Sequence, residues 1–202
     1  METFLKSHAP GKVCFKPTDG WGGSSLSAIE LVPGIANLVV KNLQSHEKSN
    51  IQSFVTASLP LNDTSGWIIE KYFQQHTLLD GVNASSLNTL RVWVMKSEKS
   101  GDGNVLGAFL RLGRKGAVAD NQAGNRIVAN VDLASGRLDA ASHGTPELTT
   151  YACHPDSGEV IQGKVVPHWG VVKQLCIDTL AISQRQISPA WILPSAPTIA
   201  WW

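Results

Sequence analysis

The fold is decided by residues 87–125, which read LNTLRVWVMKSEKSGDGNVLGAFLRLGRKGAVADNQAGN. Apolar and other side chains alternate through residues 88–96, and a period of two residues is typical of a half-buried β-strand. Residues 97–103 contain the Gly, Ser and Asp that favour turns, and residues 104–112 are again largely apolar. The stretch therefore predicts a β-hairpin that is followed by a loop of small and polar residues.

Two arginines, Arg91 and Arg111, lie inside these otherwise apolar strands. Burying a guanidinium group without a partner is costly, so each must meet a carboxylate of the protein or a bound anion. The planar guanidinium group binds phosphate and carboxylate oxygens in a bidentate manner, and the polar residues Asp120 and Asn121 follow closely. We predict an anion site, with both arginines on one face of adjacent antiparallel strands. A structural ion pair with a nearby carboxylate is the alternative.

The composition excludes several classes of protein. The chain has 202 residues, of which 43% are hydrophobic and 16% charged, enough for one sizeable globular domain or two small subdomains. A net charge of +1 without long basic runs argues against nucleic-acid binding. No apolar run reaches the length of a membrane span, and the first ten residues lack a signal-peptide core. Three cysteines without CxxC spacing indicate a reducing compartment, so we predict a cytoplasmic location.

A glycine-rich segment near the N-terminus is a second candidate anion site. Residues 13–16 are predicted to form a strand that ends at Lys16, and the flexible residues 17–24 follow. Small residues let backbone N–H groups converge on an anion, and the Lys16 ammonium group would reach a phosphate held there. The segment is not a Walker A loop, because no Gly-Lys-Ser/Thr follows the glycines and a strand is expected next. An ordinary glycine-rich hairpin is the alternative to an anion site. The loop residues of the anion hypothesis are Gly20, Gly22, Gly23 and Ser24.

The remaining helices, strands and loops are predicted from the spacing of apolar residues and from the positions of Gly and Pro. Residues 77–86 lack a regular period and are predicted to connect two subdomains. His154 and Asp156 lie in a turn-rich segment, for which we predict hydrogen-bonded structure rather than a metal site. We predict strands at residues 26–32 and 67–73, a hairpin at 126–133 and 137–141, loops at 151–167, and helices at 35–45 and 168–185.

Several short motifs occur in the order found in one protein superfamily. They are Phe15-Lys16-Pro17 with the glycines of residues 20–23, a hydrophobic strand with a central Glu at 68–73, Asn-Thr-x-Arg at 88–91, Arg-x-Gly-Arg at 111–114, Asp-Asn with Ala-Gly at 120–124, a His-Pro segment ending in Gly at 154–158, and Val-Pro-x-Trp at 166–169. Because these motifs occur in this order over residues 10–202, the chain resembles the ATP-grasp superfamily. It is most similar to the sugar-transfer-associated ATP-grasp proteins, which are related to alpha-L-glutamate ligases.

The resemblance implies an α+β fold with a partial ATP-grasp architecture. A small nucleotide-flap subdomain is expected at residues 10–76, and the antiparallel sheet of the catalytic subdomain at residues 87–202. The implied activity is that of an ATP-dependent ligase in polysaccharide or cell-surface biosynthesis. It would join a carboxylate to an amine or a thiol through an acyl-phosphate. Its partners would be small-molecule carboxylates and amines, and its cofactors ATP and Mg²⁺.

The resemblance also assigns a role to each candidate residue. The residues expected at the ATP phosphates are Lys16, Gly20, Gly22, Gly23 and Ser24. Those expected at the adenine are Glu70, Lys71 and Phe73. The expected catalytic residues, which would steady the acyl-phosphate, are Arg91 and Arg111. The expected substrate-binding residues are Asp120 and Asn121.

One feature of the resembled family is missing from the sequence. No Glu-x-Asn motif follows Asn121, where that family holds magnesium, so no metal ligand is assigned and the Mg²⁺ ligands are expected beyond the C-terminal end. The chain is accordingly interpreted as a fragment without turnover of its own. Its apolar residues 198–202 make association into a homo-oligomer an expectation. The alternatives are a non-catalytic nucleotide- or sugar-phosphate-binding module and a structural domain of a polysaccharide-assembly complex.

Overall fold

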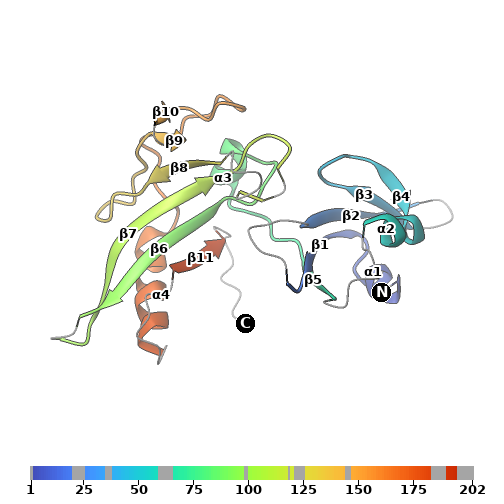
Figure 1. Cartoon of the computed structure of the whole chain (residues 1–202), viewed down its shortest axis with the longest axis horizontal. Coiled ribbons are helices and arrows are strands. Elements are labelled where there is room, and N and C mark those ends of the chain that lie inside the picture. The colour runs from blue at the N-terminus through green and yellow to red at the C-terminus, as the bar shows by residue number, and fades with distance from the viewer. Residues whose placement is uncertain are drawn as a thin grey trace.

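The computed structural model describes residues 2–19, 26–34, 38–58, 66–97, 100–117, 119–120, 126–143, 147–182 and 190–194. Its strands form two antiparallel sheets, each with a hydrophobic core of its own (Figure 1). Helices combined with antiparallel sheets agree with the α+β fold that the sequence predicts. The subdomain limits at residues 10–76 and 87–202 stay a prediction. No helix within the described residues is long and apolar enough to cross a membrane.

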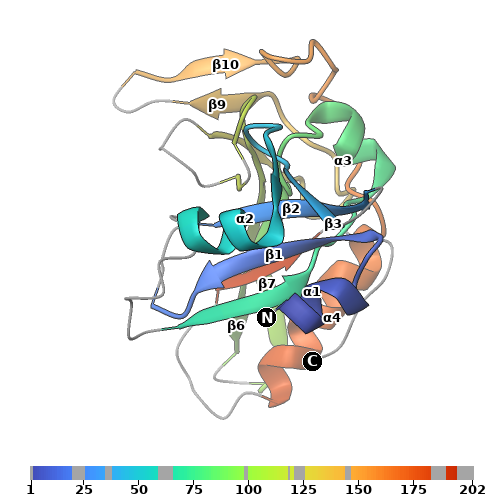
Figure 2. The ribbon, with the colours of Figure 1, turned by 90° about the vertical axis from the view of Figure 1, so that its right-hand side faces the viewer.

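The five-stranded sheet, called the first sheet below, comes from the N-terminal part of the chain. Its strands, in spatial order, are β4 (Lys48–Asn50), β3 (Leu38–Asn42), β2 (Ser27–Pro33), β1 (Gly11–Pro17) and β5 (Trp67–Lys71). Helices α1 (Glu2–Ser7) and α2 (Ile51–Ser58) lie against one of its faces (Figure 2). Val13 and Phe15 of β1 point into the core beneath these helices, where Phe15 meets Phe54 of α2. Because neighbouring residues of a strand point to opposite faces, Cys14 and Lys16 lie on the face opposite to the helices.

The six-stranded sheet, called the second sheet below, contains the predicted hairpin. Its strands, in spatial order, are β10 (Thr149–Tyr151), β9 (Ala141–His143), β8 (Ile127–Asn130), β7 (Gly103–Leu112), β6 (Thr89–Lys96) and β11 (Ala190–Pro194). Helix α4 (Trp169–Ile182) packs on one face and shares a buried core with Leu90 and Val92 of β6 and Leu110 of β7. The residues that alternate with these along β6 and β7 therefore lie on the other face.

Several predicted elements are confirmed. Strands β1, β2, β5, β6 and β7 and helix α4 lie where the sequence predicts them. The register between β6 and β7 shifts between Trp93 and Val94, which indicates a β-bulge. The second predicted hairpin turns at Gly136 (φ 75°), and its returning arm forms isolated bridges before β9 begins. The apolar run at residues 198–202 lies outside the described part of the chain.

The helix predicted for residues 35–45 is wrong in the part that the structure describes. Leu38–Asn42 forms strand β3, which pairs with β2 along its whole length. The Asn42 side chain then accepts hydrogen bonds from the N–H groups of Gln44 (2.8 Å) and Ser45 (3.0 Å), and these turn the chain toward β4. The β-branched valines of β3 favour a strand. Pairing with β2 also gives hydrogen-bond partners to backbone groups that would have none at the ends of a short helix.

Residues 77–86, predicted to connect two subdomains, lie between the last strand of the first sheet and β6 of the second, and they contain regular structure that the sequence did not indicate. This segment includes the short helix α3 (Thr77–Val82) and joins a buried network of amide side chains. Gln75 Nε2 donates to the backbone oxygen of Asn83 (2.7 Å), and Gln75 Oε1 accepts from Asn88 Nδ2 (2.9 Å). Buried polar groups need such partners, so the network fixes the path of the chain between the two sheets. Hydrogen bonds of this kind leave no period in the sequence.

Candidate functional site

The two strand arginines lie on one face of the second sheet. Thr89 pairs with Arg111 across β6 and β7, and Arg91 pairs with Phe109 two residues further along. Directly paired residues share a face, as do residues two apart in a strand, so both arginines lie opposite to α4. This part of the prediction is confirmed. Strand β6 begins, and β7 ends, on the side of the second sheet that is nearest the first sheet (Figure 1).

A buried carboxylate holds Arg111. The Nη2 atom of Arg111 lies 3.0 Å from Oδ1 of Asp120, and Asp120 is only 4% exposed. Oδ2 of Asp120 accepts hydrogen bonds from the Thr89 N–H group (2.9 Å) and from the Thr89 hydroxyl group. The same hydroxyl oxygen accepts from Arg111 Nε (3.1 Å) and Nη2 (2.8 Å). The structural ion pair considered as the alternative is therefore present at Arg111, on the face where Arg91 lies.

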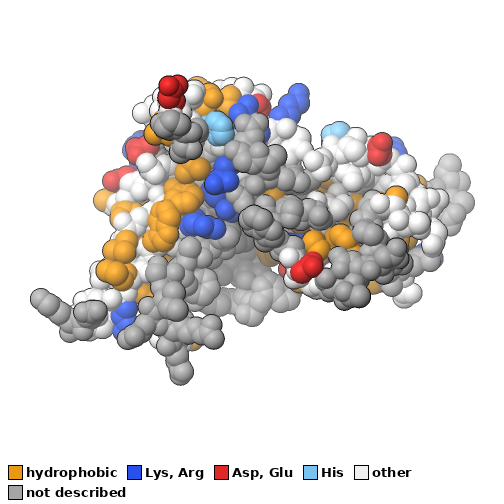
Figure 3. All heavy atoms as spheres, viewed as in Figure 1, with side chains coloured by type: hydrophobic (Ala, Val, Ile, Leu, Met, Phe, Trp, Pro, Cys, Tyr) orange, Lys and Arg blue, Asp and Glu red, His pale blue; other side chains and the backbone are white. Residues whose placement is uncertain are grey.

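Burial and neighbouring charges both shift the pKa values of Arg111 and Asp120. Burial lowers the pKa of the Arg111 guanidinium group, Asp120 opposes this, and the positive charges of Arg91 and Arg126 lower the pKa further. Burial also raises the pKa of the Asp120 carboxyl group, against the opposing effects of Thr89 and Arg111. Arg111 thus lies close enough to Asp120, Arg91 and Arg126 for the charge of each to change its pKa. In Figure 3, Lys and Arg side chains (blue) gather on the second sheet beside the first.

Arg91 carries a buried hydrogen-bond donor. Its Nε atom is buried and has no hydrogen-bond partner among the described residues. A buried donor without a partner costs about 1–3 kcal/mol, and more when the group is charged. An oxygen of a bound carboxylate or phosphate would satisfy this donor. Arg91 is therefore the described arginine that is best prepared to receive a ligand.

Lys16 of β1 and Glu70 of β5 form an ion pair on the first sheet. Cys14 pairs directly with Glu70 and is two residues from Lys16, so the three side chains share the face opposite to α1 and α2. Burial raises the pKa of the Cys14 thiol to about 11, with Lys16 opposing the rise and Glu70 adding to it. The thiol therefore stays protonated at neutral pH. The Lys16 and Glu70 side chains are 47% and 44% exposed, so a ligand can reach both.

The structure brings some of the predicted site residues together. Lys16 and Glu70 meet on the first sheet, where Lys71 ends β5 and Phe73 follows it. Arg91, Arg111 and Asp120 meet on the second sheet. Strands β1 and β5 lie on the side of the first sheet nearest the second (Figure 1), and Gln44 Nε2 donates across the boundary to the Gly116 oxygen at 3.0 Å. The predicted residues outside the described part of the chain are Gly20, Gly22, Gly23, Ser24 and Asn121.

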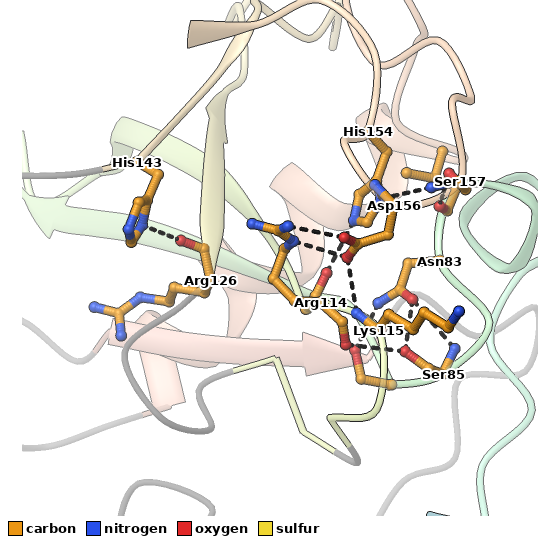
Figure 4. Close-up of polar contacts among 12 residues, drawn as sticks. Asn83, Ser85, Arg114, Lys115, Arg126, His143, His154, Asp156 and Ser157 are labelled. Carbon is orange, nitrogen blue, oxygen red and sulfur yellow. Dashed lines mark hydrogen bonds and ion pairs between the residues drawn. The ribbon is translucent and has the colours of Figure 1, made fainter. Parts of the chain in front are cut away.

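A cluster of polar contacts ties the end of β7 to the turn that follows β10 (Figure 4). Arg114 Nε and Nη2 donate to the two oxygens of Asp156 at 2.7 and 2.8 Å, and the Lys115 N–H group donates to Oδ2 at 2.8 Å. His154 is buried, and its Nε2 lies 2.9 Å from the Gly113 oxygen. Hydrogen-bonded structure at His154 and Asp156 is thus confirmed. Arg114 and Asp156 are 42 residues apart, so no local pattern reveals their pairing.

A metal site is not formed by the described residues. They contain no group of three or more His, Cys, Asp or Glu side chains that could hold a metal ion. His154 is engaged through both ring nitrogens, because Nδ1 lies 3.3 Å from the Asp156 N–H group while Nε2 contacts Gly113. With Nδ1 accepting, Nε2 carries the proton and donates to the carbonyl oxygen. The histidine therefore serves the loop structure.

The Asp156→Asn variant should be less stable than the wild type by about 1 kcal/mol near neutral pH. The hydrogen bond from Arg114 lowers the pKa of Asp156 to about 2, whereas an unfolded chain has a value of about 3.9. Because the folded pKa is the lower one, this stabilisation is complete above about pH 4 and is lost as the pH falls toward 2. Urea unfolding of both proteins from about pH 7 to pH 3 should show a difference that narrows in acid. A difference that does not change with pH would contradict the assignment.

A comparison with known families adds an independent finding. Residues 1–187 match the family model described as sugar-transfer associated ATP-grasp. The match spans every described helix and strand except β11, and it includes all the site residues placed above. No curated protein and no solved structure matches the chain.

Proposed function

Because the chain belongs to the sugar-transfer-associated ATP-grasp family, we propose that it serves as an ATP-dependent ligase for a small-molecule carboxylate, with its site at the boundary between the two sheets. The observation that carries the proposal is the buried donor of Arg91 beside the fixed guanidinium group of Arg111. Arg111 is fixed by Asp120 and Thr89, while the neighbouring Arg91 keeps a buried donor for which the described residues provide no partner. An acyl-phosphate and a carboxylate are anions of the kind that such arginines bind.

In this proposal, the arginines bind the reacting groups directly. Arg91 contacts the substrate carboxylate, and Arg111 contacts the transferring phosphoryl group. Asp120 acts through Arg111, since its oxygens already accept hydrogen bonds from Thr89 and Arg111. Asn121 directly follows Asp120 and is proposed to stay beside the substrate. A guanidinium group fixed in this way needs little reorganisation when charge develops on the phosphoryl oxygens.

The nucleotide is proposed to lie against the first sheet. Lys16 would bind its phosphates together with Gly20, Gly22, Gly23 and Ser24. Glu70 and the backbone of Lys71 and Phe73 would contact the adenine. Lys16 is about half exposed in its ion pair with Glu70, so its ammonium group can exchange a carboxylate oxygen for a phosphate oxygen without first leaving a buried site. The ion pair itself adds little stability, as is usual for exposed pairs.

The proposed reaction has two steps. A carboxylate oxygen attacks the γ-phosphorus of ATP, so that an O–P bond forms while the bridge between the β- and γ-phosphates breaks and ADP leaves. An amine or thiol then attacks the acyl carbon, loses its proton, and displaces inorganic phosphate. Both steps depend mainly on positioning and on charge neutralisation, which the arginines supply. Mg²⁺ would accompany the nucleotide, and no step is assigned to it here, because the described residues contain no cluster of ligands for a metal.

Calorimetric titration with Mg-ATP tests the nucleotide part of the proposal. The wild type should bind, and Lys16→Gln should weaken binding by roughly tenfold, because one charge-assisted contact to phosphate is lost. Lys48→Gln is the matched control, because Lys48 lies on β4, at the opposite edge of the first sheet from β5. Equal affinities of the two variants would overturn the assignment of Lys16. Release of ADP with a panel of carboxylates and amines then separates a ligase from a module that only binds nucleotide.

A further inference from the structure

Two aromatic rings lie beside Arg91 on the same face of the second sheet. Phe109 pairs directly with Arg91, and Trp93 is two residues further along β6. The ring centroids of Trp93 and Phe109 are 4.8 Å apart with an interplanar angle of 53°. Trp93 is 37% exposed, although it occupies a strand in which the alternate residues are fully buried. The two rings therefore form an aromatic surface next to Arg91, whose buried Nε has no partner among the residues that the structure describes.

Gly107 makes room for this surface. It is the residue that pairs with Trp93, and a Cβ atom at this position would lie 3.2 Å from Cε3 of the indole ring. The absence of that atom lets the ring lie close against β7. The indole is therefore supported from one side by the backbone and keeps its other side partly open. A rigid, supported ring loses little conformational freedom when a ligand covers it.

A polar group borders the same surface. Asn130 of β8 pairs with Phe109, on the side away from β6, and it is exposed. Along β6, the apolar surface continues past Trp93 to the exposed side chain of Met95, which is two residues further on and on the same face. Figure 3 shows hydrophobic side chains (orange) in a stripe along this sheet, with Lys and Arg side chains beside its upper end. The surface thus offers a guanidinium group, two rings and an amide within a few neighbouring strand positions.

We infer that Arg91, Trp93 and Phe109 form one subsite for a carboxylate-bearing sugar ring. The inference rests on the proposed function, because it names the class of carboxylate substrate for that site. Arg91 binds the carboxylate, and the rings receive the C–H face of the sugar, since the negative face of an aromatic ring attracts C–H groups that carry a partial positive charge. Asn130 is placed to exchange hydrogen bonds with the ring hydroxyl groups.

The spacing agrees with such a ligand. Residues two apart in a strand are separated by roughly 7 Å, which is close to the span from a ring carboxylate to the far side of a six-membered sugar ring. A purely aliphatic carboxylate would use Arg91 and leave the rings partly exposed. A neutral sugar would use the rings and leave the Arg91 donor without a partner. Only a ligand with both features satisfies every group of the subsite.

Saturation-transfer NMR and calorimetry with D-glucuronate test the inference, in the absence and in the presence of ADP. The wild type should bind glucuronate, whereas D-glucose, which lacks the carboxylate, and glutarate, which lacks the ring, should bind at least about tenfold more weakly. Trp93→Ala should weaken glucuronate binding about tenfold, and Trp93→Phe should retain most of it. Arg91→Gln should abolish the preference for glucuronate over glucose. Met95→Ala, on the same strand face, is the matched control and should bind as the wild type does.

Several outcomes would overturn the inference. These are equal binding of glucuronate and glutarate, unchanged affinity in Trp93→Ala, and no binding of glucuronate either with or without ADP. Circular dichroism of each variant confirms that it folds, which is expected because Trp93 is more than a third exposed. Failure of Mg-ATP to bind while glucuronate binds would refute the ligase proposal and keep the subsite. If Mg-ATP binds and glucuronate does not, the subsite is refuted and the ligase proposal is kept.

Discussion

The Arg111→Met variant should lose about 3–5 kcal/mol of unfolding free energy, because it leaves the Asp120 carboxylate buried without its ionic partner. In the folded protein, Asp120 is 4% exposed and its Oδ1 lies 3.0 Å from Arg111 Nη2. The Thr89 hydroxyl group would also lose both hydrogen bonds from the guanidinium group. Urea unfolding near neutral pH measures the loss directly. Burial already raises the pKa of Asp120, and losing Arg111 raises it further, so the deficit should narrow as acid protonates the carboxyl group.

Two further variants separate the buried pair from an ordinary surface contact. Adding Asp120→Asn to Arg111→Met should recover at least about half of the loss, since the buried charge is removed while an oxygen remains to accept from Thr89. Lys164→Met removes the exposed ion pair with Glu159, whose N–O distance is 3.2 Å, and should cost less than about 1 kcal/mol. If Arg111→Met were as mild as Lys164→Met, the buried pair would have no structural role.

The Gly136→Ala variant should lose about 3 kcal/mol of unfolding free energy, from two separate causes. Gly136 has a φ angle of 75°, a left-handed conformation that side chains with a Cβ atom adopt at a cost of about 1–2 kcal/mol. A Cβ atom there would also lie 2.6 Å from Cγ of Trp169. The Trp169 side chain is 5% exposed, and its indole N–H group donates to the Leu133 oxygen at 3.0 Å. It can move only by breaking this bond and disturbing the start of α4.

Gly158→Ala is the matched control for Gly136→Ala. Its φ angle is 76°, and a Cβ atom at this position would meet no other atom within 4 Å. The Gly158→Ala variant should therefore lose only the unfolding free energy that the left-handed backbone conformation costs a residue with a Cβ atom, about 1 kcal/mol. The difference between the two variants, measured by thermal and urea unfolding, isolates the contact with Trp169. Equal losses would mean that Trp169 adapts freely and that the turn is not packed against α4.

Elements that depend on local patterns could be predicted from the order of the amino acids alone. The hairpin of β6 and β7 could be predicted because its residues alternate in polarity on both sides of a segment rich in Gly, Ser and Asp. Helix α4 could be predicted because its apolar spacing matches one helical face. The face shared by Arg91 and Arg111 also followed from the period of two. The ordered motifs were enough to identify the family, because each motif is short and its position relative to the others is readable along the chain.

Contacts between residues far apart along the chain depend on how the whole chain packs. The segment at Leu38–Asn42 became a strand because β2 offered it a hydrogen-bonding edge, an effect that outweighs local helical spacing. Asp120 pairs with Arg111 because the loop after β7 brings it back to the sheet, and no sequence periodicity indicates this pairing. The pairing of Arg114 with Asp156 likewise leaves no periodic pattern in the sequence. The sequence also did not reveal the buried Nε of Arg91, which has no partner in the described part of the chain, or the two rings beside it, because burial and register belong to the assembled sheet. A pattern along one strand fixes the face on which a side chain lies, but the partner on that face depends on long-range packing.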